Sequence, residues 1–326
     1  MIDPFCIGLM IGDPNGIGPE VCVKALAANT DLLGEVVLVG SRHALENALE
    51  VSQMHDWRCR LIGDTMELEG TPGTLNVLDP DNLAAQSLAL GSVSAECGRA
   101  SFEWARLCEQ LCEQRRLAGW IMAPVSAEAF KAAGVADSID DLQPAGTFMF
   151  RINGNLRVIA LSEHIPISAV PGTVTRDAIL ELLDLFNAYV GDHGMHRVRY
   201  AIAGLNPHAV GAEEVAEIGP AVEAALERGL DAVGPLPPDS VFRRCIEGEF
   251  DVVVSMYHDQ GQVALKTAAF LGACTLYVGV PYIRMTVPHG TAVDIAGKGV
   301  ARHESMSAAL RTSSSLMNGR GFPSLR

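Results

Sequence analysis

Short apolar runs rich in β-branched residues alternate along the chain with longer amphipathic stretches. The apolar runs predict strands at residues 5–11, 35–40, 120–123, 157–162, 198–203, 251–256 and 274–279. The amphipathic stretches predict helices at 19–28, 43–51, 94–114, 177–189, 213–228 and 304–316. Strands that alternate with helices in this way predict an α/β fold with a largely parallel sheet.

Three of the predicted strands lead into turns that carry a histidine. These are His164 in ALSEH, His208 in AGLNPH and His258 in SMYHDQG. The carboxyl ends of strands in open α/β sheets line the ligand crevice. Imidazoles are common metal ligands, and three of them leave a coordination position open for a substrate. The pattern predicts a metal site, with Asp259 orienting a ligand; the alternative is three structural histidines.

Two glycine-rich segments lie near the ends of the chain. In GDPNGIGPE, Gly16 and Gly18 allow a close approach to a ligand, and Pro19 suits a helix start that faces an anion. The segment VPHGTAVDIAGKG, at 287–299, can wrap a cofactor with backbone donors and one acidic side chain. The alternatives are a tight strand-to-helix connection and an irregular surface loop. The glycine spacing of the first segment is not the dinucleotide fingerprint of Rossmann folds.

Charged residues accompany the same strand ends. They are Asp239 in GPLPPDSVF, Lys266 in QVALK and Arg284 in VPYIR. Lysine and arginine in apolar surroundings indicate carboxylate or phosphate binding, whereas isolated residues of this kind are more often solvated.

Composition narrows the function classes. The chain has 326 residues, 48% of them apolar and 19% charged, which suits two globular domains or one large one. Its net charge of -15 argues against binding to nucleic acid or an anionic membrane. No apolar run reaches transmembrane length, and because the start of the sequence lacks a basic region we expect no signal peptide. The eight cysteines are scattered without a C-x-x-C pair, which favours a reducing, cytoplasmic location.

Together these motifs resemble the 4-hydroxythreonine-4-phosphate dehydrogenase family, a pattern that covers most of the chain. The most specific segments are GLNPHA, GPLPPDSVF, MYHDQG with a downstream lysine, and GVPYIR followed by HGTA. Isocitrate and isopropylmalate dehydrogenases share similar GIGPE and glycine-rich stretches. Those enzymes hold their metal with aspartates, so the histidines favour the first family.

The resemblance implies an isocitrate/isopropylmalate dehydrogenase-like fold with two α/β/α domains. Residues 1–124 and 283–326 would form an NAD-binding domain, and 125–282 a domain for substrate, metal and dimerisation. The chain would form a homodimer whose active site lies in the interdomain cleft. The metal site would be shared between subunits, with His164 and His208 from one and His258 from the other. The metal would be zinc, cobalt, nickel, manganese or magnesium.

The resemblance also assigns residue roles. Lys266, Thr275 and Arg284 match substrate-binding positions, and Lys266 and Asp239 are the candidate catalytic residues. Candidates for binding NAD or NADP are Gly16, Gly18, His289, Gly290, Thr291, Ala292 and Asp294.

The chain departs from the family pattern at three places. The usual G-H-T-E is replaced in the segment SIDDLQPAGT, at 138–147, which has no histidine. Where the family has P-[VL]-[HN]-K, this chain has Pro124-Val125-Ser126-Ala127. Thr275 stands where the family has a substrate-contacting asparagine. Each lost charge-assisted hydrogen bond to a buried phosphate is worth roughly 1.5–3 kcal/mol. The changes therefore predict a substrate other than the phosphorylated hydroxythreonine of vitamin B6 synthesis.

The predicted function is oxidation of a secondary alcohol in a small hydroxy acid, with or without decarboxylation. A terephthalate-type cis-dihydrodiol carboxylate dehydrogenase is the alternative, since those enzymes lack the same motifs. A catalytically inactive ligand-binding homologue and a non-redox metal hydrolase remain open as other classes.

Overall fold

The computed structural model describes residues 6–268 and 271–323. The chain divides into two compact units: unit 1 comprises Met1–Ala145 and Val280–Met317, and unit 2 comprises Gly146–Gly279 and Asn318–Arg326. The sequence predicts the first boundary at residue 124 and keeps the end of the chain with the first domain. In the structure this end belongs to unit 2, where the Gly321 N–H donates to the His193 carbonyl and Phe322 packs on Phe150 with ring centroids 5.0 Å apart.

Unit 1 is built on six strands that pair parallel to their neighbours. In spatial order its strands are β3 (Arg58–Leu61), β4 (Thr74–Leu78), β2 (Val36–Val39), β1 (Ile7–Met10), β5 (Gly119–Met122) and β12 (Ile283–Thr286). The central β1 and β2 are buried along their whole lengths. Continuous burial explains why they read as unbroken apolar runs in the sequence.

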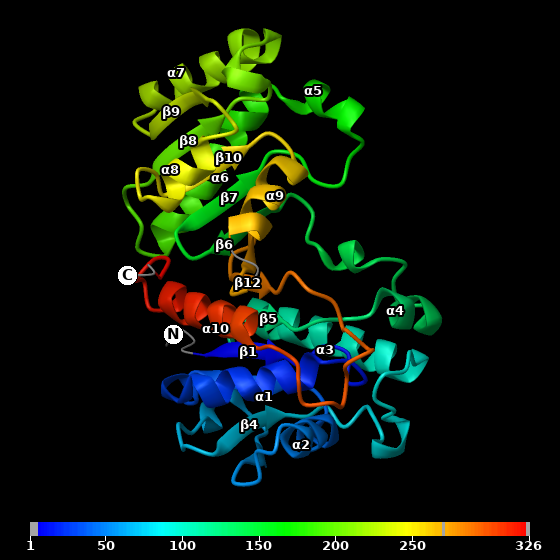
Figure 1. The fold of residues 1–326 in the computed structure, drawn as a ribbon. Helices are drawn as coiled ribbons and strands as arrows, with labels where there is room; N and C mark the ends of the chain where they lie inside the picture. Colours follow the sequence, from blue (N-terminus) through cyan, green and yellow to red (C-terminus); the bar gives the residue numbers. More distant parts are fainter. Residues whose placement is uncertain (1–5, 269–270, 324–326) are drawn as a thin grey trace. The chain divides into compact units, whose positions relative to one another are not determined.

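The helices of unit 1 are α1 (Gly18–Ala28), α2 (Arg42–Val51), α3 (Ala95–Glu113), α4 (Ala127–Ala133) and α10 (Glu304–Met317). Serine side chains cap the starts of α2, α3 and α4, namely Ser41, Ser94 and Ser126. A serine hydroxyl at this position accepts from an unpaired N–H of the first turn. Figure 1 shows α1 beside β1 and α10 along the same unit, and α10 packs on β5 and β12.

Unit 2 has a mixed sheet. In spatial order its strands are β11 (Cys274–Val278), β6 (Phe148–Asn153), β7 (Leu156–Ala160), β10 (Val252–Ser255), β8 (Arg199–Ala203) and β9 (Asp231–Leu236). The strands β11, β6 and β7 pair antiparallel, and β7, β10, β8 and β9 pair parallel. The parallel part places the carboxyl ends of β7, β10 and β8 at one edge, where the three histidine turns begin.

The helices of unit 2 are α5 (Val170–Thr173), α6 (Arg176–Asp192), α7 (Gly219–Glu227), α8 (Val241–Ile246) and α9 (His258–Ala268). A core of β7, β8, β10 and α8 side chains includes Val158, Ala201, Val253 and Phe242. In α9, a Cβ at Gly261 would lie 2.7 Å from Val158 Cγ1, so glycine lets this helix lie close against β7. Within the residues described, no helix is long and apolar enough to cross a membrane.

The predicted α/β class with largely parallel sheets is confirmed. All of the predicted strands and helices correspond to observed elements, apart from residue 5, which lies outside the described residues. Several elements were not predicted, among them β3, β6 and β12. The sequence of β3, RCRL, lies at a sheet edge with two exposed residues, and β6 carries Arg151 within an apolar run. Charge in a strand hides the periodicity on which sequence prediction depends.

Candidate metal centre and cofactor loop

Two neighbouring parallel strands of unit 2 bring His164 and His258 together. His164 follows β7, and His258 is the first residue of α9, just after β10. The two connections are joined by hydrogen bonds: the Leu161 N–H donates to the Ser255 carbonyl at 2.8 Å, and the Ser162 hydroxyl donates to the Met256 carbonyl at 3.0 Å. The strand order and these bonds fix the two turns side by side.

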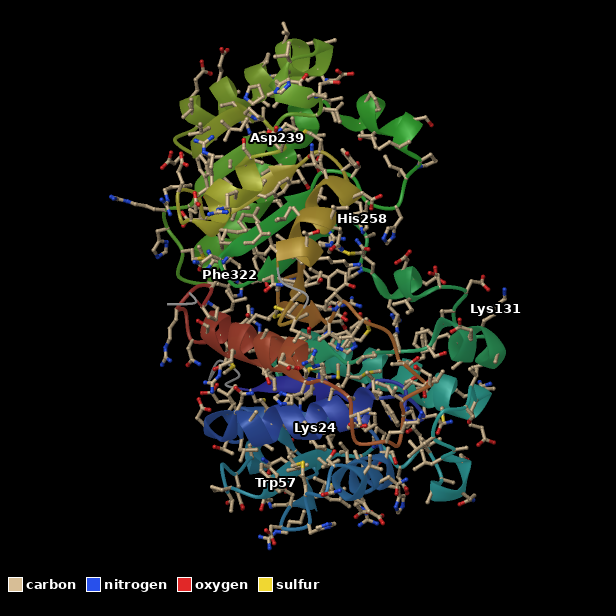
Figure 2. All side chains as sticks on the ribbon, in the orientation of Figure 1. Lys24, Trp57, Lys131, Asp239, His258 and Phe322 are labelled. Carbon is tan, nitrogen blue, oxygen red and sulfur yellow. The ribbon has the colours of Figure 1, made fainter. Side chains whose placement is uncertain are left out.

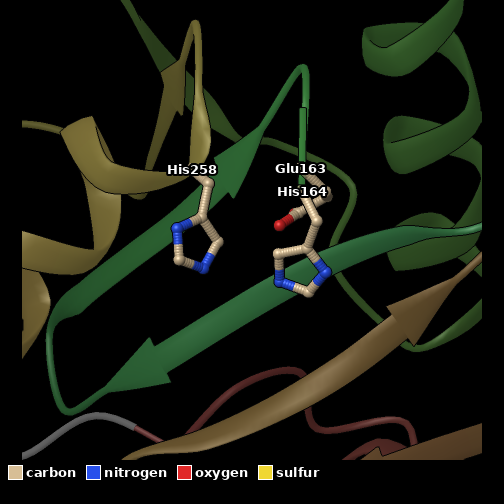
Figure 3. A group of neighbouring side chains, drawn as sticks. All are labelled: Glu163, His164 and His258. Atoms are coloured by element: carbon tan, nitrogen blue, oxygen red, sulfur yellow. The ribbon is translucent and has the colours of Figure 1, made fainter. Parts of the chain in front are cut away.

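The rings of His164 and His258 lie 5.2 Å apart, centre to centre, with a carboxylate oxygen of Glu163 beside them (Figure 3). One possible ligand atom from each of the three residues lies within 4.8 Å of the others. Ligands of a zinc-like ion lie about 2.0–2.2 Å from it, so opposite ligands are at most about 4.4 Å apart. A small rotation of the exposed His164 side chain would close that difference. Two imidazole nitrogens and one oxygen therefore suit a divalent ion.

The ring of His258 is oriented by its neighbour. Asp259 Oδ1 lies 2.7 Å from His258 Nδ1, a contact that favours the neutral tautomer with its proton on Nδ1 and its lone pair on Nε2. Asp259 is itself largely solvated, with a side chain 77% exposed. A cavity of about 330 Å³ opens over this part of unit 2. It is lined by Glu163, His164, Ile165, Ile167, Val170, Tyr257, His258 and Asp259.

A buried arginine holds Glu163. Arg151 Nη1 and Nη2 donate to the two carboxylate oxygens of Glu163 at 2.8 and 2.6 Å. Arg151 is only 4% exposed and projects from β6, opposite Thr275 of β11 in the antiparallel register. Neither Arg151 nor Glu163 was named as a site residue from the sequence. Two features of the sequence could have indicated them: Arg151 is a charged residue in the apolar run FMFRI, and Glu163 is an acid beside a candidate ligand.

His208 lies apart from this cluster. It sits in the turn Pro207–Ala209 after β8, exposed, with a left-handed φ of 59°, and Ala209 follows with φ 55°. Glu214, which is 4% exposed, supports the turn by accepting from the Asn206 backbone N–H at 2.7 Å. A single chain thus groups His164 with His258, whereas the resemblance implies His164 with His208. Strained backbone presenting an exposed imidazole is a feature of functional turns.

The other predicted residues of unit 2 have different surroundings. Lys266 is exposed near the end of α9, and its Cα is about 12 Å along the helix from that of His258. Asp239 is exposed in the turn before α8 (Figure 2). Thr275 is 6% exposed on β11. In the structure, Lys266 and Asp239 are therefore exposed to solvent, and Thr275 lies beside Arg151.

Arg284 is buried in unit 1, where the structure gives it protein partners. It is 1% exposed on β12, donates to Glu109 Oε1 at 2.8 Å and to the Leu142 carbonyl, and lies 4.9 Å above the Trp120 ring. Trp120 is its register partner on β5, which places both side chains on one face of the sheet. These contacts engage Nη1 and Nη2 of the guanidinium that the sequence predicts to bind a substrate carboxylate.

The two glycine-rich segments meet in unit 1. The Ile17 N–H donates to the Thr291 carbonyl at 2.9 Å, and a Cβ at Gly16 would lie 2.8 Å from Thr291 Cβ. A Cβ at Gly18 would lie 2.3 Å from the Ile11 carbonyl oxygen, so only glycine allows α1 to begin this close to β1. The loop at 287–299 is consequently packed against the start of α1 rather than extended into solvent.

A second anchor holds the far end of this loop. Lys24 of α1, labelled in Figure 2, donates to the carbonyls of Gly299 and Ala301 at 2.9 and 3.1 Å. Glu20 accepts from Lys24 at 2.6 Å and from the Ala301 N–H at 2.8 Å. This network is a physical reason for a glutamate in GIGPE: it fixes a segment distant in the sequence.

The predicted cofactor residues lie along the anchored loop. Thr291 and Ala292 are partly buried, Gly290 and Asp294 are exposed, and Ala292 adopts a φ of 42°. Burial lowers the pKa of His289 from its ordinary value of 6.5, although a contact with the Gly290 carbonyl opposes this shift. At neutral pH, His289 therefore remains an uncharged imidazole in a loop with exposed backbone.

Where the family pattern has a histidine or asparagine, Ser126 serves as a helix cap. Its hydroxyl accepts from the Ala129 N–H at 3.1 Å, and its side chain is buried. In the replaced G-H-T-E region, Ser138 caps the short helix Ile139–Leu142 with Asp141 as its reciprocal partner. Both side chains thus satisfy local backbone groups.

Comparison with known proteins decides the family. The profile of the family described as Pyridoxal phosphate biosynthetic protein PdxA matches residues 33–313. The chain belongs to this family. A Novosphingobium aromaticivorans protein with the provisional name 4-hydroxythreonine-4-phosphate dehydrogenase is 39% identical over 97% of this chain and 96% of its own length. The D-threonate 4-phosphate dehydrogenase of Pectobacterium atrosepticum is 31% identical over 94% of this chain and 97% of that protein.

Solved structures agree with the family and the fold. The 4-hydroxythreonine-4-phosphate dehydrogenase of Klebsiella pneumoniae matches with a TM-score of 0.83 and 33% identity, covering 96% of this chain and 99% of that one. A terephthalate 1,2-cis-dihydrodiol dehydrogenase from Burkholderia xenovorans matches with a TM-score of 0.69 and 24% identity over 96% and 98% of the two chains, a likeness of fold alone. The resemblance inferred from the motifs is confirmed, and this PdxA-family chain is an oxidoreductase.

Proposed function

We propose that this PdxA-family chain is a dehydrogenase that depends on a divalent metal and on NAD or NADP, and that it oxidises a secondary alcohol of a small hydroxy acid. The observation that carries the proposal is the His164–His258 pair, with Asp259 fixing one ring beside a cavity. Family membership supplies the reaction class, and the pair supplies a site suited to an ion that activates a hydroxyl.

Alcohol oxidation requires a proton to leave the hydroxyl and a hydride to leave the same carbon. A divalent ion would lower the pKa of the hydroxyl, and NAD or NADP would supply the hydride acceptor. Among the chain's own groups, His258 would bind the ion through the lone pair of Nε2, while Asp259 keeps the ring proton on Nδ1. We propose Lys266 for binding the substrate carboxylate or moving a proton, and Asp239 as an exposed carboxylate that orients the substrate.

The third imidazole would come from a second copy of the chain. Within one chain His208 is exposed on the turn after β8, outside the His164–His258 cluster. We therefore propose a homodimer in which His208 of the partner subunit completes the ligand set. This differs from the arrangement implied by the sequence, where His258 crosses between subunits.

The cofactor site proposed here is the loop at 287–299 against the start of α1. Its exposed residue Gly290 offers a backbone N–H without a bulky side chain, and Gly16 lets the start of α1 lie close against the loop. The fixed position of Thr291 on Ile17 preorganises the loop, which reduces the ordering cost of binding a dinucleotide.

The experiment is a paired assay of NAD and NADP reduction with 4-phosphohydroxythreonine, D-threonate 4-phosphate and cis-dihydrodiol carboxylates. We expect turnover that is abolished by a chelator and restored by a divalent ion. His164→Ala and His258→Ala should abolish both metal binding and turnover while leaving the circular dichroism spectrum unchanged.

The same assay separates the alternatives. Dinucleotide binding with no reduction on any of these acids would favour a ligand-binding homologue. Metal binding without dinucleotide binding would favour a hydrolase. Full activity of His258→Ala would overturn the ligand assignment. Preference among the acids tests whether loss of the G-H-T-E motif has removed recognition of the 4-phosphate.

A further inference from the structure

The ion pair between Arg151 and Glu163 stands next to the two imidazoles, and the function proposed above leaves it without a role. Both carboxylate oxygens of Glu163 accept from the Arg151 guanidinium, in the bidentate geometry that is the strongest for this pair. The side chain of Arg151 is 5% exposed and that of Glu163 is 19% exposed. A buried charged pair of this kind does not by itself stabilise a fold.

The position of the Glu163 carboxylate is the informative feature. One of its oxygens lies within 4.8 Å of a nitrogen of each ring, His164 and His258. Figure 3 shows the carboxylate and the two rings turned towards a common space. Arg151, anchored in β6 and also contacting the Met149 carbonyl at 3.4 Å, holds that carboxylate in place.

We propose that Glu163 is an oxygen ligand of the metal, in addition to the histidines, and that Arg151 positions its carboxylate. The inference rests on the metal dependence proposed above. An ionised carboxylate has about four lone-pair sites, so each oxygen can accept from Arg151 and still offer a lone pair to an ion. Hydrogen-bonded carboxylates are usual among metal ligands.

The arrangement of charges is compatible with this role. Two neutral imidazoles bring no negative charge to a divalent ion, and Glu163 is the anionic group beside them. Arg151 balances the charge of Glu163, so the carboxylate would contribute a nearby oxygen lone pair rather than a net negative charge. A mixed nitrogen and oxygen set suits zinc, cobalt or manganese.

The first test measures zinc binding to the metal-free full-length protein by isothermal titration calorimetry. Glu163→Gln keeps the size of the side chain and removes its charge. We expect its dissociation constant for zinc to rise at least about tenfold. Asp251→Asn is the matched control, because Asp251 also forms a bidentate pair with an arginine of unit 2, Arg199, and lies outside the cluster. Its zinc affinity should equal that of the wild type.

The second test needs no variant, so a Glu163→Gln protein that fails to fold would not block it. Anomalous diffraction from crystals of the wild-type protein grown with zinc locates the ion. We expect a Glu163 oxygen at about 2.0–2.2 Å from zinc.

The outcomes are distinct. Unchanged zinc affinity in Glu163→Gln, or a Glu163 oxygen more than about 3 Å from a zinc held by His164 and His258, would overturn the Glu163 proposal and leave the proposed function standing. A wild-type protein that reduces NAD but binds no zinc, cobalt or manganese would overturn the metal dependence itself, and Glu163 with it.

Discussion

The carboxylate of Asp259 lies 2.7 Å from Nδ1 of His258, the residue that precedes it. Asp259 stands in the first turn of α9, where a negative charge also interacts favourably with the helix dipole. Asp259 can therefore set the tautomer of His258, a proposed ligand, although its own side chain is largely solvated. Removing the carboxylate tests whether this orientation matters for metal binding.

We predict that Asp259→Ala weakens zinc binding about 10- to 100-fold, because the His258 ring loses the partner that orients it. Thermal stability should fall only slightly, since the lost helix-dipole interaction is worth about 0.3–1 kcal/mol. Competition with a chromophoric chelator measures the affinity. Asp231→Ala, an exposed aspartate at the start of β9, is the control and should bind zinc normally. Equal affinities in the two variants would refute the orienting role.

Arg284→Met should destabilise the protein through Glu109. Breaking a buried ion pair leaves an unpaired charge and costs about 3–5 kcal/mol; Glu109 keeps 17% exposure, so we expect the lower end of that range. The double variant Arg284→Met/Glu109→Gln should recover part of the loss. Urea denaturation measures these free energies of unfolding. A single variant with wild-type stability and a raised KM for the acid would instead identify Arg284 as a substrate ligand.

Gly16→Ala should weaken dinucleotide binding selectively. The added Cβ would lie 2.8 Å from Thr291 Cβ and 2.9 Å from the Thr291 carbonyl oxygen, which would push the 287–299 loop from α1. We expect at least about a tenfold higher Kd for NAD, or about 1.4 kcal/mol, with zinc affinity unchanged. Gly191→Ala is the matched control, since a Cβ there meets nothing within 4 Å. Fluorescence titration with NADH provides the measurement; a normal Kd in Gly16→Ala would exclude this loop position from cofactor binding.

His289 should make stability depend on pH. Burial lowers its pKa in the folded state below the ordinary 6.5, so the unfolded chain takes up a proton more readily than the folded one. The stabilising contribution of the neutral ring is full above pH 6.5 and is lost as the pH falls below that value. We expect His289→Gln to reduce the loss of unfolding free energy between pH 7.5 and about pH 5.5. Denaturation curves of the wild type and the variant at both pH values provide the measurement. An equal loss of unfolding free energy in the two proteins would show that the ring is solvated and would contradict the prediction.

Much of this molecule follows from local sequence. Apolar runs such as those of β1 and β10 predicted strands because burial on both faces requires continuous hydrophobicity. The turns after β7, β8 and β10 marked His164, His208 and His258, since ligand sites form at the carboxyl ends of parallel strands. Motif order was enough to indicate the family that the comparisons confirm.

Contacts between segments that are distant in the sequence could not be predicted from local sequence. Arg151 and Arg284 are both arginines in apolar runs, yet one pairs with Glu163 beside the imidazoles and the other with Glu109 over Trp120. Their partners are set by strand order and register, which are properties of the whole sheet. The same limit applies to domain boundaries, because residues 318–323 belong to unit 2 through tertiary packing.

The sequence by itself determined the α/β class, the family and the three candidate histidines after the strands, because each depends on residue type, periodicity and order along the chain. Only the tertiary structure decided that His164 and His258 meet within one chain, that His208 stands apart, and that Glu163 joins the pair. Which side chains share a space depends on strand order and on the turns between strands and helices, and a linear pattern carries neither.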